Sequence, residues 1–416
     1  MFDLDRLQEI WVTITRNKVR SFLTGFGVFW GIFMLMIMLG AGHGLERGMM
    51  KNIDGFATNS CFMGAGSTAL PYKGFQKGRN WNIHNRDLDI LLRSVPEIEC
   101  LSPMLFGGRS NNNVVFNDHS GSYNVRGLHA NYVAIERQRM LFGRFINEID
   151  ILQARKVCVI GTAVYEELFP TKGNPIGKYI RINGIYYQVA GVSSGVSNIS
   201  IGGRSEESVI IPFTTMQQIN NQGDIVHMLA ATTHPNQSVK NMEEKMKTTL
   251  KANNRIAPED MQAIWGFNLE EQFNIFKYLF IGIAVVIWVV GSGTLIAGII
   301  GVSNIMMVTV KERTKEIGIR RALGAKPRTI MIQIISETLV LTSIAGLSGL
   351  CFGVLCLHLA DVWLQKAEDV FLSEPVISFG TAVTSTLILL ICGLFAGSIP
   401  ASRALRIKAI DAIREE

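Results

Sequence analysis

The chain has 416 residues, of which 48% are hydrophobic and only 18% are charged, and its mean hydropathy is positive at +0.25. This composition excludes a purely soluble protein, and a net charge of +6 is modest. The six cysteines and seven histidines occur singly, without the spacings of zinc or redox motifs. We therefore expect no metal site, no disulfide scaffold and at most one disulfide.

The first sixteen residues have an amphipathic pattern, with Leu4, Leu7, Trp11 and Ile14 at helical spacing and charged residues between them. The pattern predicts either a helix lying on the membrane surface or a helix packed on another protein. The apolar stretch that follows is too long for a cleaved signal peptide and lacks a small-residue cleavage site.

Four stretches are long and apolar enough to cross a bilayer, which takes about 20 residues. They are residues 21–45, 278–310, 329–360 and 375–402. The second could reach about 50 Å, against a hydrocarbon core of about 30 Å. We expect it to continue as a helix into the outer domain, with a tilt or a kink at Gly291 and Gly293 as the alternative.

The charges between these stretches predict their orientation. Residues 1–20, 311–328 and 403–416 hold four, seven and four Lys or Arg, whereas residues 361–374 hold one lysine and four acids. The positive-inside rule therefore places both termini and the 311–328 loop in the cytoplasm. Everything between the first two spans then lies outside.

This outer block, about residues 46–277, has a mixed α/β pattern and nearly balanced charge, with 24 Lys or Arg and 21 Asp or Glu, so nothing indicates nucleic acid. Residues 156–161 and 208–213 read as strands, and residues 178–192 as a hairpin around Asn183–Gly184. Residues 85–95 and 238–253 have helical periodicity. The first segment would carry Leu88, Leu91 and Leu92 on its apolar face, and the second would carry Met242, Met246 and Leu250. No catalytic motif is present, and GNPIGKY (173–179) lacks the spacing of a phosphate loop.

Small residues recur four apart in the apolar stretches, at Gly27/Gly31, Ala297/Gly301, Gly349/Gly353 and Gly393/Gly397. Such pairs let helices approach closely in lipid. Four spans make a thin bundle, so we expect a homodimer or a pairing with a related subunit.

The segment KERTKEIGIRRALGAKPRTI (311–330) combines seven cations with helical signals. Glu316 and Arg320 form a favourable i,i+4 pair, Gly324 suits a helix C-terminus, and Pro327 suits the first turn of the next helix. We expect a short helix, a tight turn and entry into the third span. Its apolar stripe, Ile319 and Leu323, predicts a docking surface, whereas basic character alone would fit any cytoplasmic loop.

Four motifs resemble FtsX/MacB-type ABC transporter permeases, the type VII group that includes LolC and LolE. The first is ERTKEIGIRRALGAKPRTI with QIISETLVLTSIAGLSGL, and the second is NKVRSFLTGFGVFWGI. The third joins GLHANYVAIERQRMLFGRFINEID, ARKVCVIGTAVYEELFP and NPIGKYIRINGIYYQVAGV, and the fourth is IPASRALRIKAIDAIREE. The C-terminal motif departs from the family at Ile407–Ala409, where a proline-containing step is usual. The resemblance covers nearly the whole chain.

The resemblance implies an α-helical four-span bundle with a large mixed α/β extracytoplasmic domain inserted between spans 1 and 2. Residues 1–45 would hold the amphipathic helix and span 1, residues 46–273 a periplasmic core domain, and residues 274–416 an FtsX-like permease region. Within the core domain, residues 46–105 and 205–273 would form a porter-like part and residues 106–204 an inserted β-rich part.

The resemblance also implies a coupling helix that docks on a cytoplasmic ATPase. Carried over residue by residue, it falls on Glu312, Arg313, Glu316, Gly318, Arg320, Arg321, Gly324 and Ala325. Glu337, an acid within the third span, has either a coupling role or, as we favour, a hydrogen bond inside the bundle.

The implied protein is the inner-membrane permease subunit of a mechanotransmission exporter, whose cargo is hydrophobic, lipidated or peptide-like. ATP and Mg²⁺ would bind a separate ATPase subunit, because this chain has no Walker A motif and so no ATPase activity or cofactor of its own. A periplasmic adaptor and an outer-membrane channel are further partners that the resemblance leaves open. The alternative is an FtsX-like regulator that activates a cell-wall hydrolase.

Overall fold

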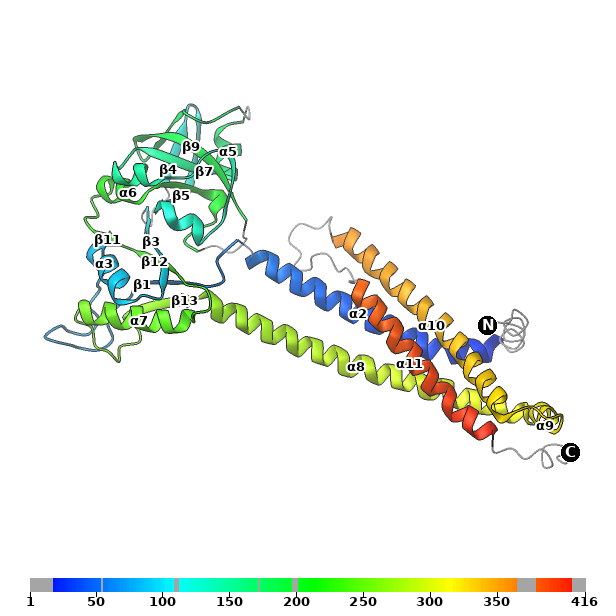
Figure 1. Cartoon of the computed structure of the whole chain (residues 1–416). Coiled ribbons are helices and arrows are strands. Elements are labelled where there is room, and N and C mark those ends of the chain that lie inside the picture. The colour runs from blue at the N-terminus through cyan, green and yellow to red at the C-terminus, as the bar shows by residue number, and fades with distance from the viewer. Residues whose placement is uncertain are drawn as a thin grey trace. The chain divides into compact units, whose positions relative to one another are not determined.

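A computed structural model describes residues 18–53, 55–107, 112–170, 173–196, 201–364 and 379–405 of the chain (Figure 1). The chain divides into two compact units. Residues Met1–Met49 and Tyr278–Glu416 form the first, called here the membrane unit, and Met50–Lys277 form the second, called the outer domain. The predicted core domain of residues 46–273 differs from this outer domain by four residues at each end.

The membrane unit is built from long helices, each apolar and long enough to cross a membrane. They are α2 (Lys18–Ile53), α8 (Leu269–Glu312), α10 (Pro327–Leu364) and α11 (Phe379–Ala404), with the short α9 (Thr314–Ala322) between α8 and α10. The 44 residues of α8 form one helix of about 66 Å through Gly291 and Gly293. The prediction that this helix continues into the outer domain is confirmed, because it begins at Leu269 and that domain extends to Lys277.

Several predictions fall outside the described residues. These are the amphipathic helix over residues 1–16, most of the acidic 361–374 loop, the start of the fourth span at residues 375–378, and the basic segment after residue 405. All six cysteines lie within the described ranges, and all are free thiols.

Small residues allow the helices to approach closely. A Cβ atom added to Gly27 of α2 would lie 3.3 Å from the Cα of Gly298 of α8. One added to Gly393 of α11 would lie 2.5 Å from the hydroxyl of Thr342 of α10. The predicted Ala297/Gly301 pair differs, because a Cβ on Gly301 would meet no atom of the described chain within 4 Å.

Helices α2 and α10 run parallel in a constant register. A Cβ added to Gly25 would lie 3.3 Å from the Cβ of Ala345, one on Gly349 would lie 2.5 Å from the carbonyl oxygen of Phe29, and one on Gly353 would lie 3.6 Å from that of Phe33. Each pair is offset by 320 residues. Position 18, the first residue of α2, is therefore level with position 338 of α10.

The outer domain is built on an 11-stranded mixed sheet. Its strands are β1 (Ser60–Ala65), β3 (Ile98–Phe106), β4 (Asn112–Phe116), β5 (His119–Leu128), β6 (Gln138–Gly143), β7 (Val157–Gly161), β8 (Tyr179–Ile182), β9 (Ile185–Gly195), β10 (Ser208–Pro212), β12 (Met228–Thr233) and β13 (Ile264–Asn268). Strands β2 (Ile83–His84) and β11 (Ile225–Val226) form a separate pair. The helices are α3 (Asn85–Ser94), α4 (Glu148–Leu152), α5 (Thr162–Leu168), α6 (Phe213–Ile219) and α7 (Val239–Asn253), with 3₁₀ turns η1 (Ala130–Ala134) and η2 (Ser205–Glu207).

The strands and helices predicted for the outer block are confirmed. Asn183 and Gly184 have φ angles of 48° and 90°, the left-handed pair that a tight hairpin between β8 and β9 requires. The apolar face of α7 is buried as expected. On α3, however, Leu92 is exposed while Leu91 is fully buried, because only a narrow stripe of this helix faces the core.

Two groups of strands meet in the sheet. Strands β1, β3, β12 and β13 form one part, and β4 to β10 form the β-rich part, joined where β3 pairs with β5. Strand β10 pairs with β5 and β7. The β-rich part therefore continues past position 204, the boundary expected from the sequence, to at least Pro212.

Candidate functional site

The segment between α8 and α10 folds as a helix, a tight turn and the start of a new helix. Helix α9 ends at Ala322, Gly324 has a φ of 91°, and Pro327 is the first residue of α10. The amide of Ala325 donates to the carbonyl oxygen of Arg320 over 3.0 Å, which closes the turn. The sequence-based prediction for this segment is confirmed.

Charged side chains fix α9 to its neighbours. Arg320 donates from Nη2 to Oε1 of Glu316 over 2.8 Å, the predicted i,i+4 pair, and from Nη1 to Oε1 of Gln333 on α10 over 2.9 Å. Glu316 also forms an ion pair with Arg313, whose Nε lies 3.4 Å from its Oε2. One arginine thus joins α9 to α10, and another joins α9 to the end of α8.

Glu337 lies at the centre of this arrangement. Its side chain is 8% exposed, and its Oε2 lies 3.3 Å from Nη1 of Arg313. A cavity of about 30 Å³, with room for about one water molecule, is lined by these charged residues and by Gln333 and Ile317. In the register of α2 and α10, Glu337 is level with the start of α2, near the charged end of the bundle.

The outward face of α9 is apolar at two positions. Ile319 is 52% exposed and Leu323 is 83% exposed, whereas Ile317 and Gly318 are buried against the bundle. Glu312 and Lys315 are exposed beside them. The opposite face of α9 is packed on the bundle. An exposed apolar pair surrounded by charges on such a helix is typical of a surface on which another protein docks.

The structure brings together Arg313, Glu316, Arg320 and Glu337, although Glu337 lies 24 residues after Arg313. Arg321 faces elsewhere and donates to the carbonyl oxygen of Leu405 after α11 over 3.1 Å. Sequence reasoning missed Gln333. Its position one turn before Glu337, on the same helix face, was the available signal.

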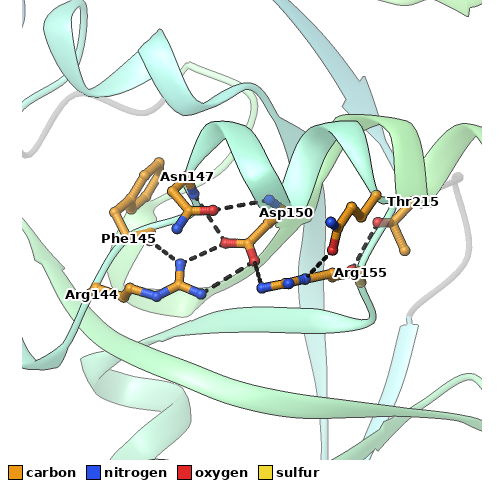
Figure 2. Close-up of polar contacts among 7 residues, drawn as sticks. Arg144, Phe145, Asn147, Asp150, Arg155 and Thr215 are labelled. Carbon is orange, nitrogen blue, oxygen red and sulfur yellow. Dashed lines mark hydrogen bonds and ion pairs between the residues drawn. The ribbon is translucent and has the colours of Figure 1, made fainter.

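The outer domain holds a second charged cluster around the buried carboxylate of Asp150 (Figure 2). Arg144 donates from Nη1 to Oδ2 over 2.5 Å, the amide of Asn147 donates over 3.1 Å, and Arg155 lies 3.8 Å away. Burial alone would raise the pKa of Asp150, but the bonds from Arg144 and Asn147 and the nearby charges outweigh it and hold the pKa below its ordinary value.

A third cluster ties the chain that follows α2 to the β-rich part. The amide of Ala57 donates to Ile135 over 2.8 Å, and next to it the buried carboxylate of Glu136 accepts from the hydroxyl of Tyr132 over 2.8 Å. Arg126 of β5 lies 3.6 Å from Glu136 and donates to Ser205 over 2.7 Å. Burial, with the charge of Glu136, raises the pKa of Tyr132 well above its ordinary value. The hydroxyl of Ser205 also donates to Glu136, so this buried carboxylate is held by two hydroxyls and an arginine.

In the comparison with known proteins, two family models match successive parts of the chain. The model of the MacB-like periplasmic core domain matches residues 21–249, and that of the FtsX-like permease C-terminal region matches residues 288–409. The chain is 26% identical to the macrolide export ATP-binding/permease protein MacB of Bdellovibrio bacteriovorus, covering 99% of the chain and 62% of that relative. It is 29% identical to the pyoverdine export ATP-binding/permease protein PvdT of Pseudomonas savastanoi pv. phaseolicola, covering 99% and 60%.

The chain therefore spans about 60% of the length of these curated relatives. Among solved structures, the periplasmic region of MacB from Actinobacillus actinomycetemcomitans aligns with a TM-score of 0.43 and 18% identity, over 55% of this chain and 97% of that one. The match to the periplasmic core model alone takes in more than half of the chain. The chain therefore belongs to the FtsX-like permeases that carry a MacB-like periplasmic core domain, and it is a membrane protein.

Proposed function

We propose that this chain is the permease subunit of a mechanotransmission ABC exporter in the bacterial inner membrane, with both termini cytoplasmic and the outer domain in the periplasm. ATP hydrolysis on a cytoplasmic partner would move the outer domain, and that motion would export or extract hydrophobic, lipidated or peptide-like cargo. The names of two relatives, which export a macrolide and pyoverdine, support a cargo of this class.

The observation that carries the proposal is the continuity of α8. This helix begins directly after β13 of the outer domain and ends at Glu312, so that only Arg313 separates it from Thr314, the start of α9. Arg313, at the junction, holds Glu316 on α9 and Glu337 on α10. A force applied to the exposed face of α9 would therefore act on α8 and α10 together.

A separate ATPase polypeptide, with ATP and Mg²⁺ bound there, is part of the proposal. Support comes from the names of the relatives, which describe an ATP-binding part as well as a permease. The Arg-rich turn and the exposed Leu323 would form the permease side of this contact.

A homodimer formed through α8 is the second part of the proposal. One exposed face of this helix carries Gly293, Ala297, Gly301, Asn304 and Val308. An amide in a span is costly in lipid unless it finds a partner, and small residues allow a second helix to approach closely. A second copy of this chain, or a related permease subunit, would supply both contacts. An adaptor and an outer-membrane channel would complete the path for cargo.

The test is purification of the tagged chain in mild detergent from its native host, with and without trapped ATP. We expect a stoichiometric partner that contains a Walker A motif and hydrolyses ATP. Accumulation of a periplasmic cargo after deletion would support export. A cell-wall cleavage defect without such cargo would instead identify an FtsX-like regulator, and a preparation without ATPase under both conditions would contradict the docking role of α9.

A further inference from the structure

A buried carboxylate joins three segments of the outer domain that are far apart in the sequence. The backbone at Glu136 pairs with Phe56, which lies in the chain that follows α2. The side chain of Glu136 is buried and accepts one hydroxyl at each oxygen, from Tyr132 of η1 at Oε2 and from Ser205 of η2 at Oε1. One side chain thus holds η1 and η2 at the place where the chain from α2 arrives.

The two hydroxyls come from elements that belong to different parts of the sheet. Helix η1 is attached to β3, because the side-chain amide of Asn131 donates to the carbonyl oxygen of Leu101 over 2.9 Å. Strand β3 pairs with β12, in the part that also contains β1 and β13. Helix η2 packs instead on α5, β7 and β9 of the β-rich part. Glu136 therefore fastens the β-rich part to the rest of the outer domain.

The arginine beside this carboxylate does not make the pair that its chemistry favours. Arg126 of β5 is only 1% exposed, yet its Nη1 lies 3.6 Å from Oε2 of Glu136, beyond hydrogen-bond distance. Its Nη2 donates to Ser205 over 2.7 Å, whereas Nε and Nη1 have no hydrogen-bond acceptor within the described part of the chain. A guanidinium and a carboxylate bind most strongly as a bidentate pair, with N–O distances of about 2.7–2.9 Å. The two hydroxyls of this cluster therefore compete with Arg126 for the same carboxylate.

We propose that Glu136, Tyr132 and Ser205 form a latch whose partners can exchange. In the state that this structure holds, the carboxylate binds the two hydroxyls. In the other state it forms a bidentate pair with Arg126, which releases both hydroxyls and allows the β-rich part to turn about the β3–β5 pairing. Residues 55–57 pair with residues 135–137 at the latch, so a displacement of the chain that leaves α2 would act directly on it. The inference concerns the outer domain alone and does not depend on the cargo or the ATPase.

The first test is hydrogen exchange of the full-length chain in detergent, with its co-purifying subunits, read over residues 55–57, 135–137 and 205–207. Tyr132→Phe removes one hydroxyl from the latch and should accelerate exchange in all three segments about tenfold, while exchange in β12 stays unchanged. Tyr165→Phe is the matched control, because its hydroxyl donates to the carbonyl oxygen of Gly173 over 3.0 Å, within the β-rich part. Equal exchange in the two variants would overturn the proposal.

The second test distinguishes an exchange of partners from the loss of one bond. Lysine keeps the charge of Arg126 but cannot form the bidentate pair, so Arg126→Lys should disfavour the released state. Added to Tyr132→Phe, it should slow exchange in the three segments severalfold, toward the rate of the unaltered chain. Exchange that stays as fast as in Tyr132→Phe alone, or becomes faster, would show that no competing pair forms and would overturn the proposal. Ser205→Ala should act in the same direction as Tyr132→Phe, and it repeats both comparisons if the tyrosine variant does not fold.

Discussion

Arg313 and Glu337 form an ion pair at 3.3 Å between the junction of α8 with α9 and the third turn of α10. The same arginine lies 3.4 Å from Glu316 of α9. Because Glu337 is almost fully buried and Arg313 is 29% exposed, the pair is shielded from bulk water. It connects three helices through one guanidinium, and its loss should affect all three.

Breaking this pair should destabilise the bundle and weaken coupling. We expect Glu337→Gln to lower the free energy of unfolding by up to about 3 kcal/mol, at the lower end for a buried pair because Arg313 is partly hydrated. Thermal unfolding in detergent measures this. Arg313→Glu with Glu337→Arg should recover part of the loss, and a double variant no better than the single ones would contradict a direct interaction.

The exposed leucine of α9 should matter for partner binding and not for folding. Leu323→Ser should leave the melting temperature unchanged and weaken binding of the co-purifying ATPase at least tenfold, as for an apolar interface anchor. Leu152→Ser in the outer domain is the matched control, because both leucines are 83% exposed. Pull-down with purified ATPase compares the two, and equal binding would place the contact elsewhere.

Reversing the charge of Glu316 should uncouple the chain from the ATPase while it stays inserted and folded. Glu316 accepts contacts from both Arg313 and Arg320, so Glu316→Arg would place three cations together on an exposed helix. The measurement is ATPase binding and activity in the reconstituted complex. Unchanged binding and unchanged activity would show that this face of α9 does not dock. Glu259→Arg, at an exposed acid of the outer domain, controls for the charge change itself.

Gly298 and Gly301, which both lie on α8, should respond differently to substitution. Gly298→Leu should destabilise the membrane unit by about 1–3 kcal/mol or more, because an added Cβ would lie 3.0 Å from the carbonyl oxygen of Gly27. Gly301→Leu should leave the fold of one chain intact, since nothing lies within 4 Å, but should reduce dimerisation. Unfolding midpoints and light scattering in detergent separate the two effects. Dimers of Gly301→Leu at normal strength would exclude α8 as the interface.

Asp150 should make the Arg144–Arg155 segment sensitive to acid. Its pKa is lower in the folded state, so its stabilising contribution is present above the ordinary value of about 3.9 and is lost as pH falls through the folded value. Hydrogen exchange of this segment in the full chain should therefore accelerate below about pH 4. Asp150→Asn should cost about 1–2 kcal/mol at neutral pH and remove the acid dependence. Glu148→Gln, on the same helix but exposed, is the control.

The local sequence determined much of this protein. Long apolar runs, in which Glu337 of the third run is the one charged residue, specify the four long helices, because a helix satisfies all its backbone groups within one segment in lipid. The Asn183–Gly184 pair specifies its hairpin, and Gly324 with Pro327 specifies the turn after α9, because few residues adopt those φ angles. The Glu316–Arg320 pair could also be predicted from the sequence, because residues four apart on a helix are neighbours on its surface.

Tertiary structure alone decided the contacts between distant segments. Gln333 and Glu337 reach Arg320 and Arg313 only because α10 returns alongside α8, and no spacing in the sequence encodes that return. The same holds for Gly301, which has the pattern of a packed glycine and yet meets nothing in the described chain, and for β10, which joins the β-rich part past the expected boundary. Periodicity shows which face of a helix is apolar, whereas only packing determines what that face touches.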